Sequence, residues 1–507
     1  MRFPRASGVL LHITSLPGPH GSGDLGAQAY RFIDWLKIAG QSLWQILPLG
    51  GIGPGNSPYM SSSAFAGNVL LIDLTELQQR GWLTPAELFL AAGAETDHIE
   101  FDAMIQFRMS RLELAAQRFG KAMTDEERAD FAAFAAHHGE WLNDYALFMA
   151  LAERAGGGNW PEWRRPLAQR HPGALIQACQ EHADRVFFWK FCQWCFFRQW
   201  LRLKAYANSN GVKILGDVPI FVAHQSAEAW SRPELFELDD HGQPQVVAGV
   251  PPDAFSETGQ LWGNPLYRWS AHTAEDYQWW IARIRHIFEL VDIARIDHFR
   301  GFEAYWEVSA TEATAVNGRW VEAPGDQLFA AIAAALGRLP IVAEDLGQIT
   351  PGVDVLRRKH GFPGMCILQF AWHSAGASES RYLPHNHRVD TVVYTGSHDN
   401  NTTLGWWRSA PDNVKHHLRE YLATDGQDIS WALIRTALAS VADMSICPMQ
   451  DILQLGAEHR MNLPGSSQGN WTWRFNWGQV RTGHATRLHR ICELSGRLPT
   501  PDNAVHL

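Results

Sequence analysis

The chain of 507 residues is poor in cysteine and in basic clusters: it has 6 Cys, and 43 Lys and Arg stand against 53 Asp and Glu. Six cysteines in this length do not make a disulfide scaffold, which favours a cytoplasmic protein. The formal charge of −10 opposes a phosphate backbone, and the basic clusters, such as Arg164-Arg165, are short. We therefore expect no nucleic-acid partner. No apolar run reaches the roughly 18 residues of a membrane span, so we expect no membrane partner. The apolar stretch near the start of the sequence is too short for a secretory signal.

Several sequence motifs with well-understood chemistry are missing as well. There is no GxSxG turn, which disfavours a serine hydrolase, and there is no P-loop. The glycines of GPHGSGDLG lack the GxGxxG spacing of a dinucleotide site. Cys192 and Cys195 form a CxxC pair inside the apolar, helix-like FFWKFCQWCFFRQW, with no second ligand pair nearby. We interpret them as core cysteines rather than as a zinc or redox site.

Tryptophan, in contrast, is abundant, with 23 residues. Its large apolar ring suits a core, and its flat face also suits a flat, weakly charged ligand such as a sugar ring. Composition alone leaves both interpretations open.

A strand and helix pattern repeats along the chain and suggests a fold. Eight apolar runs, most of them preceded by an amphipathic helix, are predicted as strands: 9–16, 42–49, 213–222, 293–299, 340–347, 365–370, 391–399 and 444–449. Parallel strands with crossover helices wind right-handed, and eight of them close into a barrel. A doubly wound open sheet is the alternative, but the missing glycine fingerprint disfavours it. We predict an α/β protein with a (β/α)8 TIM barrel.

Two stretches break the repeat and are predicted as insertions. Residues 75–200 look mostly helical and form a candidate subdomain after the second strand. Residues 223–272 are rich in Pro, Gly and Asp and are expected to form loops, or a lid, after the third strand. Residues 1–507 are thus predicted to be a single catalytic barrel domain with these two additions.

Acidic residues stand where several of the predicted strands end. These are Asp217, Asp297, Glu344 with Asp345, and Asp399. In such a barrel, the active site lies at the carboxyl ends of the strands. A single acid at that place often caps the following helix. Carboxylates at four strand ends repel one another without helping the fold, which points to a function or to a metal.

Arg295 and Asp297 make the sharpest prediction. Strand alternation places them on one face and Ile296 on the other, so we expect both to face the barrel mouth. The guanidinium favours an ionised carboxylate, which a glycosidic nucleophile requires, although a purely structural salt bridge is the alternative. Glu344 ends the apolar run before it, and neighbouring carboxylates would help it to hold its proton as a general acid. Asp345 is expected to brace the following turn.

Residues 397–400, Ser-His-Asp-Asn, follow the seventh predicted strand. The histidine and asparagine could donate hydrogen bonds to sugar hydroxyls, and Asp399 could accept a pair of them. The neighbouring His398 and Asp399 also suggest a catalytic dyad or a metal site, with His385 and His387 of LPHNH as further ligands. We predict no metal.

These residues and their surroundings resemble the 4-alpha-glucanotransferases called amylomaltases or disproportionating enzymes. They are of the glycoside hydrolase family 77 type in the alpha-amylase-like clan. The resemblance covers nearly the whole chain. It rests on SGVLLHITSLPGPHGSGDLG, LPLGGIGPGNSPYMSSSAFAGN, GDVPIFVAHQSAEAW, GVPPDAFSETGQLWGNPLY, ARIDHFRGF, AEDLG, LPHN, TGSHDNNTT, MNLPG and NWTWRF.

The resemblance implies three catalytic carboxylates. Asp297 matches the nucleophile, Glu344 the acid/base, and Asp399 the acid that fixes the hydroxyls of the reacting sugar. The loop 251–265 resembles a lid over an acceptor channel. The matching substrate-binding residues are Tyr59, Asp217, Asp253, Trp262, Arg295, His398 and Asn462.

The implied activity is transfer of α-1,4-glucan segments between maltooligosaccharides by a retaining double displacement, without a cofactor. The implied partners are α-1,4-glucans and maltooligosaccharides, and the oligomeric state stays open. Acceptor subsites would be lined by aromatic residues, with Tyr59, Phe255, Trp262 and the NWTW segment as candidates. A hydrolase of the same clan, a non-catalytic glucan-binding protein and a metal-dependent barrel hydrolase are the alternatives.

The sequence departs from its relatives in a few features. Ala254 stands where many relatives are expected to have an aromatic residue, which would weaken a lid contact. The β-sandwich that follows the barrel in alpha-amylases is not visible, in agreement with amylomaltases. The longer N-terminal extension of some bacterial relatives is not visible either.

Overall fold

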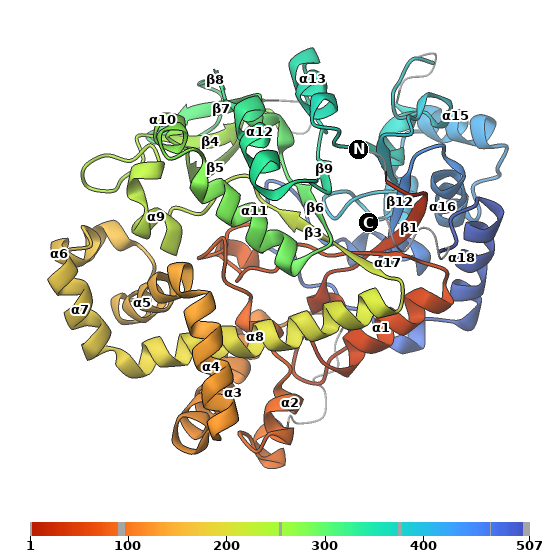
Figure 1. Cartoon of the computed structure of the whole chain (residues 1–507). Helices are drawn as coiled ribbons and strands as arrows, with labels where there is room; N and C mark the ends of the chain where they lie inside the picture. The colour runs from red at the N-terminus through yellow and green to blue at the C-terminus, as the bar shows by residue number, and fades with distance from the viewer. Residues whose placement is uncertain (1–2, 90–96, 253–255, 374–377, 467, 500–507) are drawn as a thin grey trace.

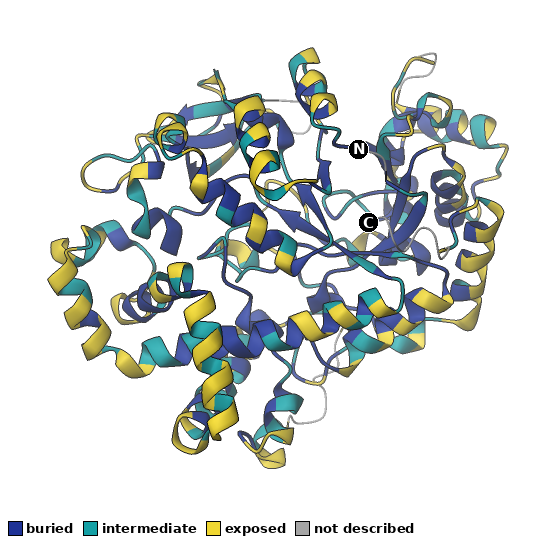
Figure 2. Ribbon diagram, viewed as in Figure 1, coloured by how far each residue is buried: buried dark blue, intermediate teal, exposed yellow. Residues whose placement is uncertain are grey.

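A computed structural model describes residues 3–89, 97–252, 256–373, 378–466 and 468–499 (Figure 1). No helix among these residues is both long and apolar enough to cross a bilayer. The strands of the central sheet are buried, whereas most of the helices around it have exposed faces (Figure 2).

Eight parallel strands of the described residues form one sheet in the order β10, β11, β12, β1, β2, β3, β6, β9. Their bounds are β1 Ala6–Leu10, β2 Leu43–Gln45, β3 Lys213–Val218, β6 Ile293–Ile296, β9 Ile341–Ala343, β10 Gly364–Ile367, β11 Thr391–Tyr394 and β12 Met444–Pro448. The backbone N–H of Ala343 in β9 donates to the carbonyl of Pro363, just before β10, at 2.9 Å. This contact brings the two outermost strands together. The predicted barrel is therefore confirmed, and the doubly wound alternative is wrong.

Burial on both faces explains why the barrel strands are short apolar runs. Every residue of β1, β6, β9 and β12 is buried. Parallel strands covered by helices on the outside and by side chains within the barrel have no solvent face, so they lack polar alternation.

The helices connect and cover these strands. Their bounds are α1 Ala27–Ile38, α2 Leu74–Gln79, α3 Phe101–Ala122, α4 Asp125–His137, α5 Gly139–Ala155, α6 Arg165–Ala168, α7 Pro172–Glu181, α8 Ala183–Ser209, α9 Ala227–Ser231, α10 Trp269–Ala274, α11 Gln278–Leu290, α12 Gly325–Leu336, α13 Pro351–Lys359, α14 Thr403–Ser409, α15 Asp412–Leu422, α16 Ile429–Ala439, α17 Met449–Ile452 and α18 Thr482–Leu494.

Helices α2 to α8 occupy the segment between β2 and β3, where helices were expected. Helix α8 runs beneath the barrel in Figure 1, and α2, α3 and α4 project below it. Cys192 and Cys195 lie on α8, and both are buried free thiols whose pKa is raised by burial. A buried protonated thiol is inert, as expected for core cysteines.

The prediction of loops over residues 223–272 is wrong at two strands and at the short helices α9 and α10. Strands β4 (Val246–Val250) and β5 (Gln260–Pro265) pair with β7 (Ala304–Ser309) and β8 (Gly318–Glu322) in an antiparallel sheet of order β5, β4, β7, β8. β4 pairs with β7, which lies more than fifty residues further along the chain and follows another barrel strand. Such non-local pairing leaves little trace in a local pattern rich in Pro and Gly.

Candidate active site

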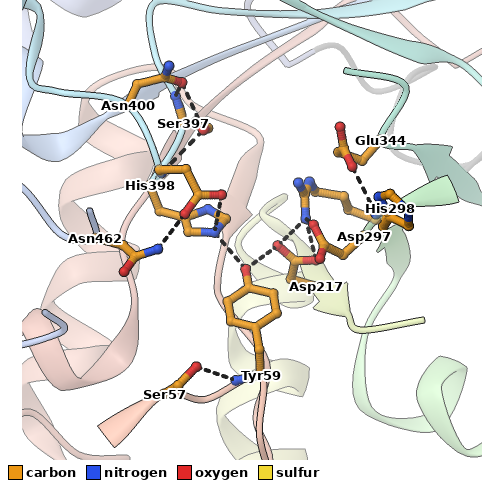
Figure 3. Close-up of polar contacts among 12 residues, drawn as sticks. Ser57, Tyr59, Asp217, Asp297, His298, Glu344, Ser397, His398, Asn400 and Asn462 are labelled. Atoms are coloured by element: carbon orange, nitrogen blue, oxygen red, sulfur yellow. Dashed lines mark hydrogen bonds and ion pairs between the residues drawn. The ribbon is translucent and has the colours of Figure 1, made fainter. Parts of the chain in front are cut away.

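The acidic side chains singled out in the sequence lie at or beyond the carboxyl ends of four barrel strands. Asp217 is the next-to-last residue of β3, Asp297 comes directly after β6, and Glu344 directly after β9. Asp399 lies in the turn beyond β11 rather than at the end of that strand. Figure 3 shows Asp297 and Glu344 on one side of the group and His398 and Asn462 on the other.

Arg295 joins two of these carboxylates. Its Nη1 atom donates to both oxygens of Asp217 at 2.6 Å and to Oδ1 of Asp297 at 2.9 Å. The side chains of Arg295 and Asp217 are 3% and 0% exposed, whereas that of Asp297 is 27% exposed. Burial by itself would lower the pKa of the Arg295 guanidinium, but the charges of Asp217 and Asp297 hold that pKa well above its usual range. Asp297 is thus paired on one side and accessible on the other.

The backbone holds both oxygens of Glu344. The N–H of His298 donates to Oε2 at 2.8 Å, and the N–H of Leu346 donates to Oε1 at 2.7 Å. Burial and the charge of Asp297 together raise the pKa of Glu344 to about 8, although Arg295 and the two N–H groups oppose the rise. Glu344 therefore keeps its proton at neutral pH, as a general acid must.

His298 links this acid to Asp297. It has a φ of 51°, in the left-handed region that is uncommon for residues other than Gly and in which Asn, Asp and His are enriched. His298 follows Asp297 directly, and the turn that this φ creates points the His298 N–H at Glu344. The sequence interpretation assigned no role to His298, because a left-handed residue has no signature in the hydrophobic pattern.

Tyr59 bridges the two halves of the group. Its hydroxyl donates to Oδ2 of Asp217 at 2.9 Å and lies 2.8 Å from Nε2 of His398 (Figure 3). The rings of Tyr59 and His398 stack with centroids 5.4 Å apart, and Trp471 packs against both. The structure therefore brings Tyr59, Asp217, Arg295 and His398 together with Asp297.

Asp399 is held on the opposite side of the group. Asn462 donates to its Oδ1 at 2.6 Å, and Nε2 of His398 lies 3.3 Å from its Oδ2. Arg460 donates to the backbone carbonyl of Asp399. The Asp399 side chain is 40% exposed, so it is oriented and still available to a ligand. Arg460 was not predicted as a site residue from the sequence, because it acts on backbone carbonyls and belongs to none of the quoted motifs.

The aromatic residues divide between partly exposed and buried positions. Trp262 in β5 is half-buried and directs its ring against His298, with centroids 4.8 Å apart at 82°. Trp471 and Trp473 are only 6% and 1% exposed. The expectation that the NWTW segment lines an acceptor subsite is therefore wrong for its tryptophans, which are packed into the core. Asp253 and Phe255, with Ala254, lie outside the described residues.

The two histidines considered as metal ligands are used elsewhere. His385 contacts the Tyr421 hydroxyl at 2.7 Å and the Ser378 carbonyl at 3.0 Å. His387 contacts the Ser440 hydroxyl at 2.8 Å and the Tyr382 carbonyl at 3.1 Å. With both ring nitrogens engaged, neither histidine offers a lone pair to an ion beside Asp399.

Comparison with known proteins gives consistent matches over nearly the whole chain. A family model described as 4-alpha-glucanotransferase matches residues 11–480. The 4-alpha-glucanotransferase of Thermus thermophilus is 49% identical over 506 residues, covering 98% of this chain and 100% of that protein. The 4-alpha-glucanotransferase of Synechocystis sp. is 46% identical over 497 residues, covering 97% and 98%. Among solved structures, the amylomaltase from Streptococcus agalactiae in complex with acarbose aligns with a TM-score of 0.95 at 38% identity, covering 98% of this chain and 100% of that one.

Proposed function

The chain belongs to the 4-alpha-glucanotransferase family, and from this premise we propose that it transfers glucan segments through a covalent ester on Asp297. A segment of an α-1,4-glucan donor would pass to the 4-hydroxyl of an acceptor glucan or glucose. The observation that carries the proposal is that residues close together in the chain hold Asp297 and Glu344 in place. Arg295 fixes Asp297, and the N–H of the very next residue holds Glu344.

In the first step, an oxygen of Asp297 attacks the anomeric carbon while Glu344 gives its proton to the leaving glycosidic oxygen. The carbon–oxygen bond to the leaving sugar breaks, and an ester bond to Asp297 forms with inversion. The raised pKa of Glu344 supports its part in this step, since the acid is protonated at neutral pH.

In the second step, the ionised Glu344 takes the proton of the acceptor 4-hydroxyl, whose oxygen displaces Asp297 from the anomeric carbon. The second inversion restores the original configuration. Asp399, oriented by Asn462, is proposed to hold hydroxyls of the reacting sugar. Tyr59, Asp217, Arg295 and His398 would complete that subsite.

The proposed ligands are α-1,4-glucans and maltooligosaccharides. The amylomaltase from Streptococcus agalactiae was solved with acarbose, and its full-length likeness to this chain supports a ligand of the same class here. Residues 251–265 are proposed as a lid, and Asp253 as one of its substrate contacts. A cytoplasmic location is supported by the cysteines, all six of which are free thiols, since a reducing compartment keeps thiols in this form.

Product analysis from maltotriose tests the proposal. Transfer yields glucose together with chains longer than maltotriose. Glucose and maltose alone would mean that water is the acceptor and that the chain acts as a hydrolase. Asp297→Asn should abolish this conversion. Its matched control is Asp292→Asn, which changes an acid just before β6, at the opposite end of the strand from Asp297. It should keep the product pattern of the unmodified protein.

A further inference from the structure

A cluster of metal-ligating side chains lies where the helical segment meets the barrel helix α11. His137 is the last residue of α4, His138 stands between α4 and α5, and Glu289 is the next-to-last residue of α11. One ligand atom from each of the three lies within 4.8 Å of the others. In the described part of the chain, this is the one group of three such side chains so close together.

The surroundings of the cluster favour a cation. The carboxyl-terminal end of α11 carries a partial negative charge from its last carbonyl groups, whereas at His138 the negative end of α4 adjoins the positive end of α5. Glu289 adds a carboxylate at the same place. Its side chain is 40% exposed, so an ion can reach the site from solvent.

His286 on α11 adds a third imidazole, and the orientation of its ring is fixed. Its Nε2 lies 2.8 Å from the carbonyl of Phe65 and must donate to it, so the neutral ring has its lone pair on Nδ1. That Nδ1 lies 3.6 Å from Oε2 of Glu289. Two zinc ligands in a tetrahedral site lie roughly 3.3 Å apart, given bonds of about 2.0–2.1 Å. A ligating histidine typically donates its other N–H to a backbone carbonyl, as His286 does to Phe65.

We propose that His137, His138 and Glu289 bind a zinc ion, and that Nδ1 of His286, which lies outside this group of three, moves closer to become the fourth ligand. Imidazole nitrogens with one carboxylate suit Zn²⁺ and not the oxygen-seeking Mg²⁺ or Ca²⁺. The bound ion joins the end of α4 to the end of α11, and so fastens the helical segment to the barrel. It has no part in the proposed transfer reaction.

One contact competes with the ion. The indole N–H of Trp141 points at Nδ1 of His138 at 3.3 Å. In the neutral ring, this contact leaves the proton on Nε2, whereas an ion bound through Nε2 needs the proton on Nδ1. An ion bound through Nδ1 displaces the indole directly. Either way zinc binding gives up this contact, so Trp141→Phe should tighten binding.

Zinc titration of the full-length, chelator-treated protein by calorimetry tests the site. We expect one ion per chain, and at least about tenfold weaker binding in His137→Ala and in Glu289→Gln. The chain has 23 histidines, so a matched control is needed for unspecific binding. His416→Ala serves, because His416 is exposed and faces a single carboxylate, Glu420, at 3.4 Å. It should bind as the unmodified protein does.

Thermal unfolding gives an independent measurement. Zinc at a hundredfold excess over its dissociation constant should raise Tm by roughly 2–3 °C in the unmodified protein and in His416→Ala, but not in His137→Ala. All three proteins should have the same Tm without zinc. Absence of one-to-one binding, or equal affinity in His137→Ala, Glu289→Gln and His416→Ala, would overturn the proposal.

Discussion

The Nη1 atom of Arg295 donates a hydrogen bond of 2.9 Å to Oδ1 of Asp297, two residues further along the chain. The same nitrogen lies 2.6 Å from both oxygens of Asp217. Asp217 thus anchors the guanidinium from the neighbouring strand β3, and the guanidinium fixes the more exposed Asp297. This arrangement gives a charged and oriented carboxylate with one accessible side, which is what a nucleophile requires.

We predict that Arg295→Met loses most transfer activity and also lowers stability. The substitution leaves a buried Asp217 without its cation, which typically costs about 3–5 kcal/mol. The double variant Arg295→Met/Asp217→Asn removes the stranded charge as well. It should regain much of the lost Tm while its transfer rate from maltotriose stays low. Recovery of the rate together with Tm would show that Arg295 acts only on stability.

Tyr59→Phe should lower the transfer rate by roughly 10- to 100-fold and lower stability by about 1–3 kcal/mol. The ring can still stack on His398, but Asp217 and His398 lose the hydroxyl that joins them, and unpaired buried polar groups carry a cost of this size. Tyr206→Phe is the matched control, because it removes an exposed hydrogen bond from a tyrosine to Asp34. Initial rates and Tm measured side by side should separate the two variants. Equal rates would contradict the bridging role of Tyr59.

The pKa of Glu344, about 8, predicts that kcat/KM falls as the pH rises through that value. The carboxylate formed above it has no proton to give to the leaving oxygen. Initial rates of maltotriose conversion between pH 6 and pH 10 would show this fall in kcat/KM. A rate still rising at pH 9 would contradict the assignment of Glu344 as the acid.

The same pKa has a consequence for stability. A glutamate whose folded pKa is raised stabilises the fold below its unfolded pKa of about 4.5, and that contribution is lost as the pH rises toward 8. Glu344→Gln carries no such charge. Its Tm relative to the unmodified protein should therefore increase as the pH rises from 5 to 9. A Tm difference that is constant with pH would contradict burial of a titrating carboxyl group.

Trimming residues 251–259 should raise hydrolysis relative to transfer. A lid excludes water and positions the acceptor sugar, so its loss favours water as the acceptor. Deletion of Gly157, in an exposed turn of the helical segment, is the control and should leave the ratio unchanged. The ratio of glucose and maltose to chains longer than maltotriose is the measurement. An unchanged ratio after trimming would count against the lid.

The barrel strands and the acids after them could be predicted because both leave local patterns. Ile341, Val342 and Ala343 are buried on every side, and Glu344 follows at the strand end. Strand alternation also predicted that Arg295 and Asp297 share a face, and their hydrogen bond confirms it. Here the local sequence determines the geometry.

What could not be predicted depends on contacts between distant parts of the chain. Strands β4 and β7 are neighbours in their sheet, but the barrel strand β6 lies between them in the sequence. Neither strand was therefore visible in its own segment. The left-handed φ of His298 shapes the turn after β6, and the N–H that this turn directs is one that any residue other than proline would carry. Trp471 and Trp262 both lie in motifs that resemble sugar-binding segments, so the sequence does not distinguish them. Only packing shows that the first is buried against Tyr59 and that the second faces His298.

The most direct measurement is the mass of Glu344→Gln after reaction with α-maltotriosyl fluoride. Fluoride leaves without a proton, so the first step proceeds, whereas the second step lacks its base and the ester accumulates. We predict a protein heavier by one maltotriosyl group, and a labelled peptide that contains Asp297. A label on another carboxylate, or release of fluoride with no covalent adduct, would contradict Asp297 as the nucleophile.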